Sequence, residues 1–184
     1  EEGADLHFIE GCSAPKYYAA NLHAGAVELF VKDGARLRYS TIENWSKNMY
    51  NLNTKRAIIG SNAKMEWVSG SFGSHVSYLY PSTIMNGDSS NCEFTGITFA
   101  GATQDLDTGC KVIINGSNNS ANVDTKSISK DGGVNTFRSA VTVGRKAENA
   151  RVAFSCQSLM LDNISRSDTI PEMDVRNATA QIGH

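Results

Sequence analysis

A short turn recurs along the chain at nearly constant spacing. Its glycines lie 26, 27, 29 and 28 residues apart, at Gly34, Gly60, Gly87, Gly116 and Gly144. A small residue follows each turn, and then comes a stretch in which apolar side chains alternate with others, as in Met65-Glu66-Trp67. Alternation with period two predicts strands with one buried face. Gly, Asn and Asp let the chain reverse sharply between such strands, so the repeating unit is strand, turn, strand.

The remainder of each period predicts a second strand. We expect further strands at residues 76–85, 110–115, 136–143 and 170–175, and no helix-length amphipathic pattern outside a doubtful stretch at 15–30. A fixed period in this range is typical of a solenoid, in which each unit covers the apolar face of its neighbour. The pattern therefore predicts an all-β solenoid of roughly seven coils, on the order of 30 Å long. An antiparallel sandwich is the alternative, but it would not require the same turn residues each time.

Composition excludes several classes of function. The chain has 184 residues, which fits one domain, and a net charge of −2 with scattered basic residues, so it has no electrostatic footprint for nucleic acid or an anionic membrane. No apolar run approaches the length that spans a bilayer.

The four cysteines, 80, 18 and 46 residues apart, match neither a zinc site nor a dense disulfide framework, so a reduced, cytoplasmic chain is expected. No phosphate-binding glycine loop of the P-loop type occurs, so ATP hydrolysis would require a partner.

The two ends of a solenoid need a cover, because they present unpaired backbone groups that invite association. No charged or helical cap follows residues 174–177. We expect that end to be covered by flanking sequence or by a second chain, and we favour a dimer through terminal coils. The chain opens on Glu1 without a Met, and we expect a segment of a longer protein.

Ten short segments resemble the SufB and SufD proteins, which are scaffolds of iron–sulfur cluster assembly, in order and in spacing. No single segment is decisive, but together they cover essentially the whole chain. They are Ile9–Pro15, Asn21–Ala24 with Val27–Leu29, Tyr39–Trp45, Tyr50–Leu52 with Thr54–Arg56, Tyr80–Ser82, Asp107–Gly109, Lys126–Ser129, Thr136–Arg138, Ser155–Leu159 and Ala180–His184.

The resemblance implies a fold and partners. It implies a right-handed parallel β-helix core over residues 1–184, flanked in full-length members by helical regions. It also implies a scaffold rather than an enzyme, working with the ABC-type ATPase SufC through regions outside this chain. In the family two cores pair, as SufB with SufD or as SufB homodimers, and a nascent iron–sulfur cluster forms near their interface. Flavin (FAD) has been associated with the family's complexes, but no residue here argues for it.

The resemblance also implies two cluster ligands. Cys156 aligns with the cysteine that family members need for cluster assembly, and His184 falls on the histidine of a His-Glu pair. Thiolate and imidazole are suitable iron ligands, and two per protomer could give four across a dimer. Glu172 is a weaker candidate, because the carboxylates around residues 166–174 could assist iron binding or form a solvated rim.

Most of the other cysteines, histidines and aromatic residues are expected to have structural roles. A lone cysteine is usually a small buried residue, and we expect this of Cys92 and Cys110, whereas Cys12 stays open between a structural and a functional role. The histidines at 7, 23 and 75 are expected to be structural, and the aromatic residues Trp45, Trp67 and Tyr80 are expected to pack between coils.

One departure from the family leaves alternatives open. Many SufB proteins carry a sulfur-accepting cysteine after the Thr-Lys-Arg segment, where this chain has Ile58 and Ile59. The chain therefore takes sulfur by another route or is a SufD-like structural partner without a cluster. A third alternative is a secreted β-helix enzyme that cleaves polysaccharides. Such sites need clustered carboxylates, and only Asp105 and Asp107 lie close together.

Overall fold

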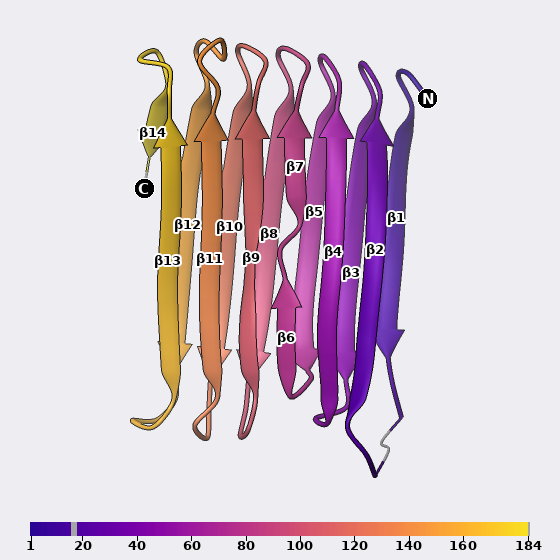
Figure 1. Ribbon diagram of the computed structural model, residues 1–184, viewed down its shortest axis with the longest axis vertical. Helices are drawn as coiled ribbons and strands as arrows, with labels where there is room; N and C mark the ends of the chain where they lie inside the picture. Colours follow the sequence, from indigo (N-terminus) through magenta and orange to yellow (C-terminus); the bar gives the residue numbers. More distant parts are fainter. Residues whose placement is uncertain (16–17, 184) are drawn as a thin grey trace.

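The computed structural model describes residues 1–15 and 18–183, and within them the chain consists of strands and short turns without a helix (Figure 1). No described segment is a helix that could cross a membrane. The strands are β1 Asp5–Ser13, β2 Asn21–Val31, β3 Arg36–Trp45, β4 Met49–Ile59, β5 Lys64–Gly73, β6 Val76–Leu79, β7 Ser82–Met85, β8 Asn91–Ala100, β9 Asp105–Ile114, β10 Ser120–Ser129, β11 Val134–Val143, β12 Arg151–Met160, β13 Arg166–Val175 and β14 Gln181–Gly183.

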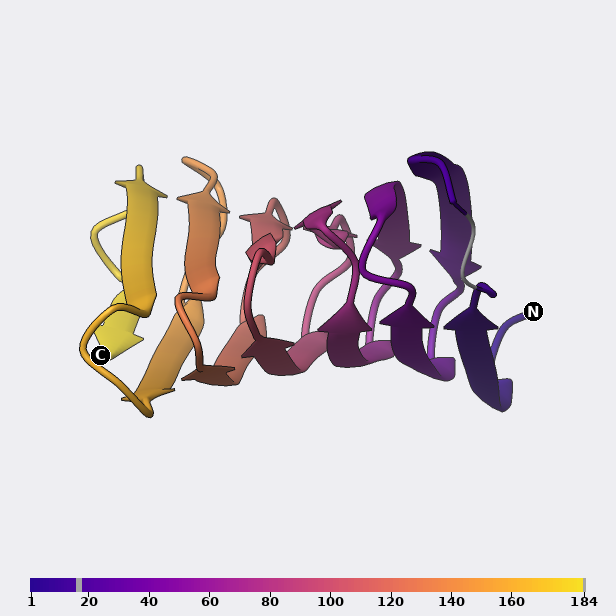
Figure 2. The same ribbon diagram turned by 90° about the horizontal axis from the view of Figure 1, so that it is seen from below.

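The strands form two parallel sheets that face one another (Figures 1 and 2). Sheet A has the order β1-β3-β5-β8-β10-β12-β14, and sheet B has the order β2-β4-β6-β9-β11-β13, with β7 also pairing β4 and β9. The chain passes from one sheet to the other at each turn, which confirms the expected parallel β-solenoid. Register partners in sheet A lie 27 to 31 residues apart, as in Lys64↔Asn91 and Asp5↔Arg36. The chain therefore completes about six turns, slightly fewer than the seven expected.

The recurring turn joins sheet B to sheet A at one end of every coil, as expected. Positive φ, however, belongs to the repeated glycine only at Gly34. The later turns place it on Asn62, Ser89, Asn118 and Asn149, with φ between 54° and 57°. Gly87 has a different role, because a Cβ there would lie 2.0 Å from the backbone nitrogen of Ser61 in the previous turn. Several of these glycines thus allow successive turns to stack closely rather than to reverse the chain.

Several expected strand boundaries were wrong. The strand expected at 76–85 is two strands, β6 and β7, because Pro81 has no N–H for the ladder. The doubtful stretch at 15–30 contains strand β2, and residues 16 and 17 lie outside the described part. Strands β9, β11 and β13 begin earlier than expected. Strands β9 and β13 open with the charged residues Asp105 and Arg166, which the apolar pattern does not mark.

The apolar core fills the half of the interior nearest the recurring turns. Trp67 is buried there, packs against Tyr39 of the neighbouring coil with the ring centroids 5.5 Å apart, and donates a hydrogen bond of 2.8 Å to Thr83. Trp45 is buried beneath His23, with the ring centroids 4.5 Å apart. Both tryptophans therefore pack between coils as expected. The other half of the interior contains polar side chains together with buried apolar ones such as Leu79 and Leu106.

Candidate functional site

Two inward-facing rows of sheet A are polar along nearly the whole solenoid, and we call them the polar stripe. Their members are in parallel register from strand to strand, so they form two lines along the interior. The first row is Glu10, Thr41, Ser69, Gly96, Thr125 and Cys156, and the second is Cys12, Glu43, Ser71, Thr98, Ser127 and Ser158. Alternation predicted the inward positions but not their polarity.

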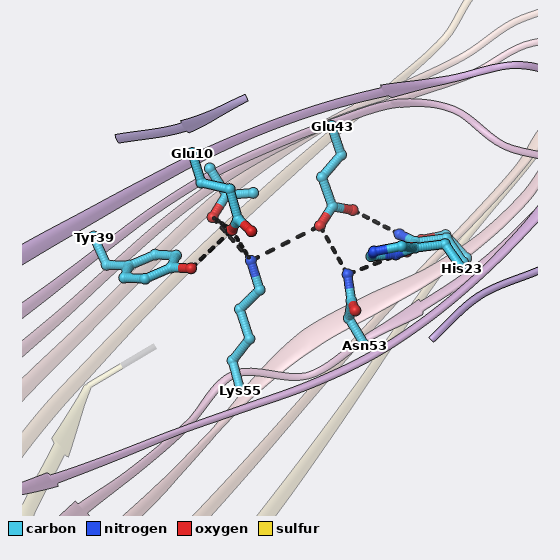
Figure 3. A network of polar contacts seen from close by, with 9 residues as sticks. Glu10, His23, Tyr39, Glu43, Asn53 and Lys55 are labelled. Atoms are coloured by element: carbon cyan, nitrogen blue, oxygen red, sulfur yellow. Dashed lines mark hydrogen bonds and ion pairs between the residues drawn. The ribbon is translucent and has the colours of Figure 1, made fainter. Parts of the chain in front are cut away.

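Lys55 of β4 reaches the N-terminal end of the polar stripe from the opposite sheet (Figure 3). Its side chain is only 3% exposed, and its Nζ lies 2.7 Å from Glu10 Oε2 and 3.9 Å from Glu43 Oε1. It also donates to Thr41 Oγ1 at 3.0 Å and lies 5.0 Å from the ring centroid of Tyr39. Two carboxylates therefore share one buried ammonium group, and each buried charge has the oppositely charged partner that it needs.

The proton equilibria of this cluster follow from its contacts. Burial acts to raise the pKa of Glu10, but hydrogen bonds from Lys55 and from the Tyr39 hydroxyl outweigh it and hold that pKa below its usual value. Burial, and then the hydrogen bond to Glu10, raises the pKa of Tyr39. At neutral pH, Glu10 is therefore a carboxylate and Tyr39 a hydrogen-bond donor.

A chain of hydrogen bonds extends the cluster to His23 of β2. Asn51 is fully buried, and its Nδ2 donates to Glu43 Oε2 at 2.6 Å and to Ser77 Oγ at 3.0 Å. These bonds fix the orientation of the amide, so its Oδ1 can only accept. It accepts from Asn53 Nδ2 at 3.2 Å and from His23 Nδ1 at 2.9 Å, so the His23 ring donates through Nδ1.

Cys12 lies beside this cluster, one strand away from Glu43 in register. Its side chain is partly exposed. Burial, and then the negative charges of Glu10 and Glu43, raises the pKa of the Cys12 thiol. The cluster therefore favours the thiol over the thiolate at this position.

Cys156 lies at the other end of the polar stripe, on β12. Its thiol is partly exposed, and its Sγ lies 3.4 Å from the hydroxyl of Thr169 on β13. It lines a cavity of about 20 Å³ between the two sheets. A cavity of that volume has no room for a flavin ring system. Cys156 is thus the only one of the four cysteines that lines this cavity.

The two remaining cysteines are core residues, as expected. Cys92 and Cys110 are buried in the apolar half of the interior. Burial raises the pKa of Cys92 to about 11 and also raises that of Cys110. At neutral pH both side chains are therefore protonated thiols.

The structure does not bring the other predicted ligands to Cys156. His184 lies outside the described residues. Glu172 lines a hollow of about 350 Å³ on the outer face of sheet B with Tyr80 and Arg138, so it does not share the interior with Cys156. No group of three metal-binding side chains occurs within residues 1–15 and 18–183.

The remaining carboxylates near the predicted sites are held in local pairs. Asp168 lies 2.7 Å from Arg166, and Asp174 pairs with Arg176. Asp107 accepts from the Tyr80 hydroxyl at 2.6 Å and pairs with Arg138 at 2.9 Å, so the two aspartates 105 and 107 do not form an open acidic site. Tyr80 is therefore anchored by Asp107 rather than packed in the core.

Sequence reasoning missed the cluster around Lys55, which the fold assembles from strands β1, β3 and β4. The one signal was a charged or amide residue at an inward position of an alternating strand, as at Glu43, Asn51 and Lys55. Such a residue requires a buried partner, and that partner comes from another coil.

Comparisons with known proteins agree with the fold and extend over the whole chain. The family described as "SUF system FeS cluster assembly, SufBD core domain" matches residues 1–184. The chain is 43% identical over 184 residues to an iron–sulfur cluster assembly SufBD family protein of Mycobacterium leprae, covering 100% of the chain and 21% of that protein. It is 44% identical to the SufBD family protein of Staphylococcus saprophyticus, covering 100% of the chain and 40% of that protein. The same identity and coverage hold for the protein of Staphylococcus aureus strain MRSA252. The chain thus spans two fifths or less of the length of these relatives.

Proposed function

The chain belongs to the SufBD core-domain family of the SUF iron–sulfur cluster assembly system, and from this premise we propose that it is part of the scaffold on which a nascent cluster forms. In this role the cluster is the cargo that the protein receives and passes on. The chain itself catalyses no bond-making step. ATP hydrolysis is supplied by a SufC-type ATPase that binds outside these residues, and the complex works in the cytoplasm.

The position of Cys156 carries the proposal. It is a partly exposed thiol at the C-terminal end of the polar stripe, and two of the other three cysteines are buried with raised pKa values. Thiolate sulfur is the usual ligand of iron–sulfur clusters, and imidazole can replace it. We assign Cys156 as one ligand and His184 as the second, with the remaining ligands supplied by a paired protomer or a SufD-like partner.

A SufD-like role without a cluster is the second candidate. It is favoured by Ile58 and Ile59, which stand where many SufB proteins have the sulfur-accepting cysteine. Ile59 is fully buried in the apolar core, so this coil presents no thiol at that place. In this alternative the solenoid shapes the complex, and its partner holds the cluster.

Anaerobic reconstitution with ferrous iron and sulfide separates the two candidates. The full-length protein in complex with its ATPase is compared with Cys156→Ser and with Cys92→Ala as a matched control, after circular dichroism confirms that both variants fold. We expect the visible absorption and the bound iron to be lost in Cys156→Ser and kept in Cys92→Ala. Full iron content in Cys156→Ser would contradict Cys156 as a ligand, and no bound iron in the wild type would support the SufD-like role instead.

A further inference from the structure

We propose that the hollow on the outer face of sheet B binds a small zwitterion of the amino-acid type, a molecule that carries one carboxylate and one ammonium group. The hollow has a volume of about 350 Å³ and is lined by residues of β9, β11 and β13 together with Tyr80. That volume lies at the small end of the range of about 300–1,000 Å³ that is usual for ligand pockets. The proposal does not depend on the cluster role, because the hollow shares no lining residue with the cavity at Cys156.

A row of outward positions across sheet B places two opposite charges on either side of the hollow. Lys111 of β9, Ala140 of β11 and Glu172 of β13 are register partners on successive strands. Neighbouring strands lie about 4.8 Å apart, so the backbones at Lys111 and Glu172 are about 10 Å apart, with only the methyl group of Ala140 between them. Both charged side chains are exposed, and neither takes part in an ion pair among the described residues. An ammonium group therefore faces a carboxylate across a small side chain.

Two further side chains of the lining are held in place by Asp107. The Nε of Arg138 donates to both carboxylate oxygens of Asp107, at 3.0 and 2.9 Å, and the Tyr80 hydroxyl donates to Oδ1 at 2.6 Å. The Asp107 side chain is only 11% exposed, whereas that of Arg138 is 48% exposed. The terminal nitrogens of Arg138 therefore remain as donors for a ligand. A guanidinium group that is fixed in this way is prepared to bind a carboxylate.

The balance of charge selects a zwitterion over a simple anion or cation. Arg138 and Asp107 neutralise one another, and Lys111 and Glu172 add one charge of each sign. A simple anion would leave Glu172 unsatisfied, and a simple cation would leave Lys111 unsatisfied. A carboxylate bound by Lys111 and Arg138 and an ammonium bound by Glu172 satisfy all three groups with charge-assisted hydrogen bonds. Ile170, which is 43% exposed and lines the hollow, offers an apolar contact for the carbon atoms of the ligand.

Isothermal titration calorimetry of the full-length protein with each of the common L-amino acids in turn tests the ligand class. We expect at least one of them to bind at one site per chain. Its N-acetyl derivative lacks the ammonium group and its amide lacks the carboxylate, so each should bind at least about tenfold more weakly through the loss of hydrogen bonds between charged groups. Equal binding of the N-acetyl derivative would show an anion site instead. That result, or no binding of any amino acid, would overturn the proposal.

Variants of the full-length protein locate the binding. Lys111→Gln and Glu172→Gln each remove one charge from the hollow. Glu28→Gln is the matched control, because Glu28 is an exposed glutamate at the N-terminal end of the same outward row. After circular dichroism confirms that the variants fold, we expect the affinity for the amino acid to fall about tenfold or more in the first two and to be unchanged in the control. Unchanged affinity in Lys111→Gln and Glu172→Gln would place the binding outside the hollow and contradict the site.

Discussion

Lys55 brings an ammonium group into an interior that is otherwise largely uncharged. Replacing it with Met keeps the length of the side chain but leaves Glu10 and Glu43 without their shared cation. Removing one partner of a buried ion pair typically costs about 3–5 kcal/mol. We therefore expect the free energy of unfolding of Lys55→Met to fall by about that amount in urea denaturation.

The matched control for this variant is Lys111→Met, which removes an exposed lysine from the middle of a strand. A surface substitution of this kind changes stability by about 0.5 kcal/mol or less. Equal losses in the two variants would mean that the ion pairs inside the solenoid contribute nothing particular.

Glu10 gives this cluster a dependence on pH. Its pKa is lowered in the folded protein, so its ionised form stabilises the fold at pH values above its ordinary pKa of 4.5. That contribution is lost as the pH falls from this value through the lowered folded pKa. In Glu10→Gln we therefore expect a smaller loss of stability on acidification than in the wild type, measured by thermal unfolding at a series of pH values. A wild-type curve and a Glu10→Gln curve of the same shape would exclude the effect.

Single residues were the least predictable part of the candidate site. Cys156 could be assigned as a ligand only through the family resemblance, because an inward cysteine in an alternating strand is otherwise interpreted as a core residue. Lys55 follows a threonine and precedes an arginine, so its sequence context predicts an exposed basic side chain. Its burial results from Glu10 and Glu43, which lie on other strands and reach it only after the coils have stacked.

Each turn between the sheets packs closely against the turn before it, so the turns form a stack along the solenoid. Gly87 tests this stacking, since a Cβ there would lie 2.0 Å from the nitrogen of Ser61 and 2.1 Å from the carbonyl carbon of Gly60. These are backbone atoms that cannot rotate away. Overpacking of this kind costs about 1–3 kcal/mol, and we expect Gly87→Ala to lose that much stability in urea unfolding.

Gly11→Ala is the control for the turn variant, because a Cβ at Gly11 meets nothing within 4 Å and its φ is not positive. We expect this change to alter stability by about 0.5 kcal/mol or less. A neutral Gly87→Ala would show that the turns can separate without cost to the column.

Elements were predictable where the different sequence signals agreed. The turn repeat and the alternation found the strands of sheet A, since turn chemistry and burial agree there. The strand at 76–85 failed because alternation continues through Tyr80 and Pro81, while proline interrupts the hydrogen-bond ladder. The segment at 15–30 was doubtful because its small residues carry a weak apolar pattern, and pairing of β2 with β4 decides its form.

The whole column has a C-terminal end at which inward side chains are left uncovered. Val141 and Val143 of β11 are buried, but their register partners Met173 and Val175 on β13 are exposed. Among the described residues no strand pairs with the outer edge of β13. Unpaired backbone groups beside exposed apolar side chains favour association with another chain.

We therefore expect the full-length protein to dimerise through its C-terminal coils, with sedimentation equilibrium at micromolar concentration as the measurement. Met173→Glu places a charge among the side chains that the partner would cover, so it should shift the mass towards that of the monomer. Ile97→Glu makes the same change at an exposed isoleucine on the outer face of sheet A and should leave the dimer intact. A Met173→Glu variant that remains dimeric would show that the dimer forms elsewhere, and a monomeric wild type would show that this end is covered by the protein's own flanking sequence. The cluster ligands proposed beside Cys156 would then have to come from a single chain.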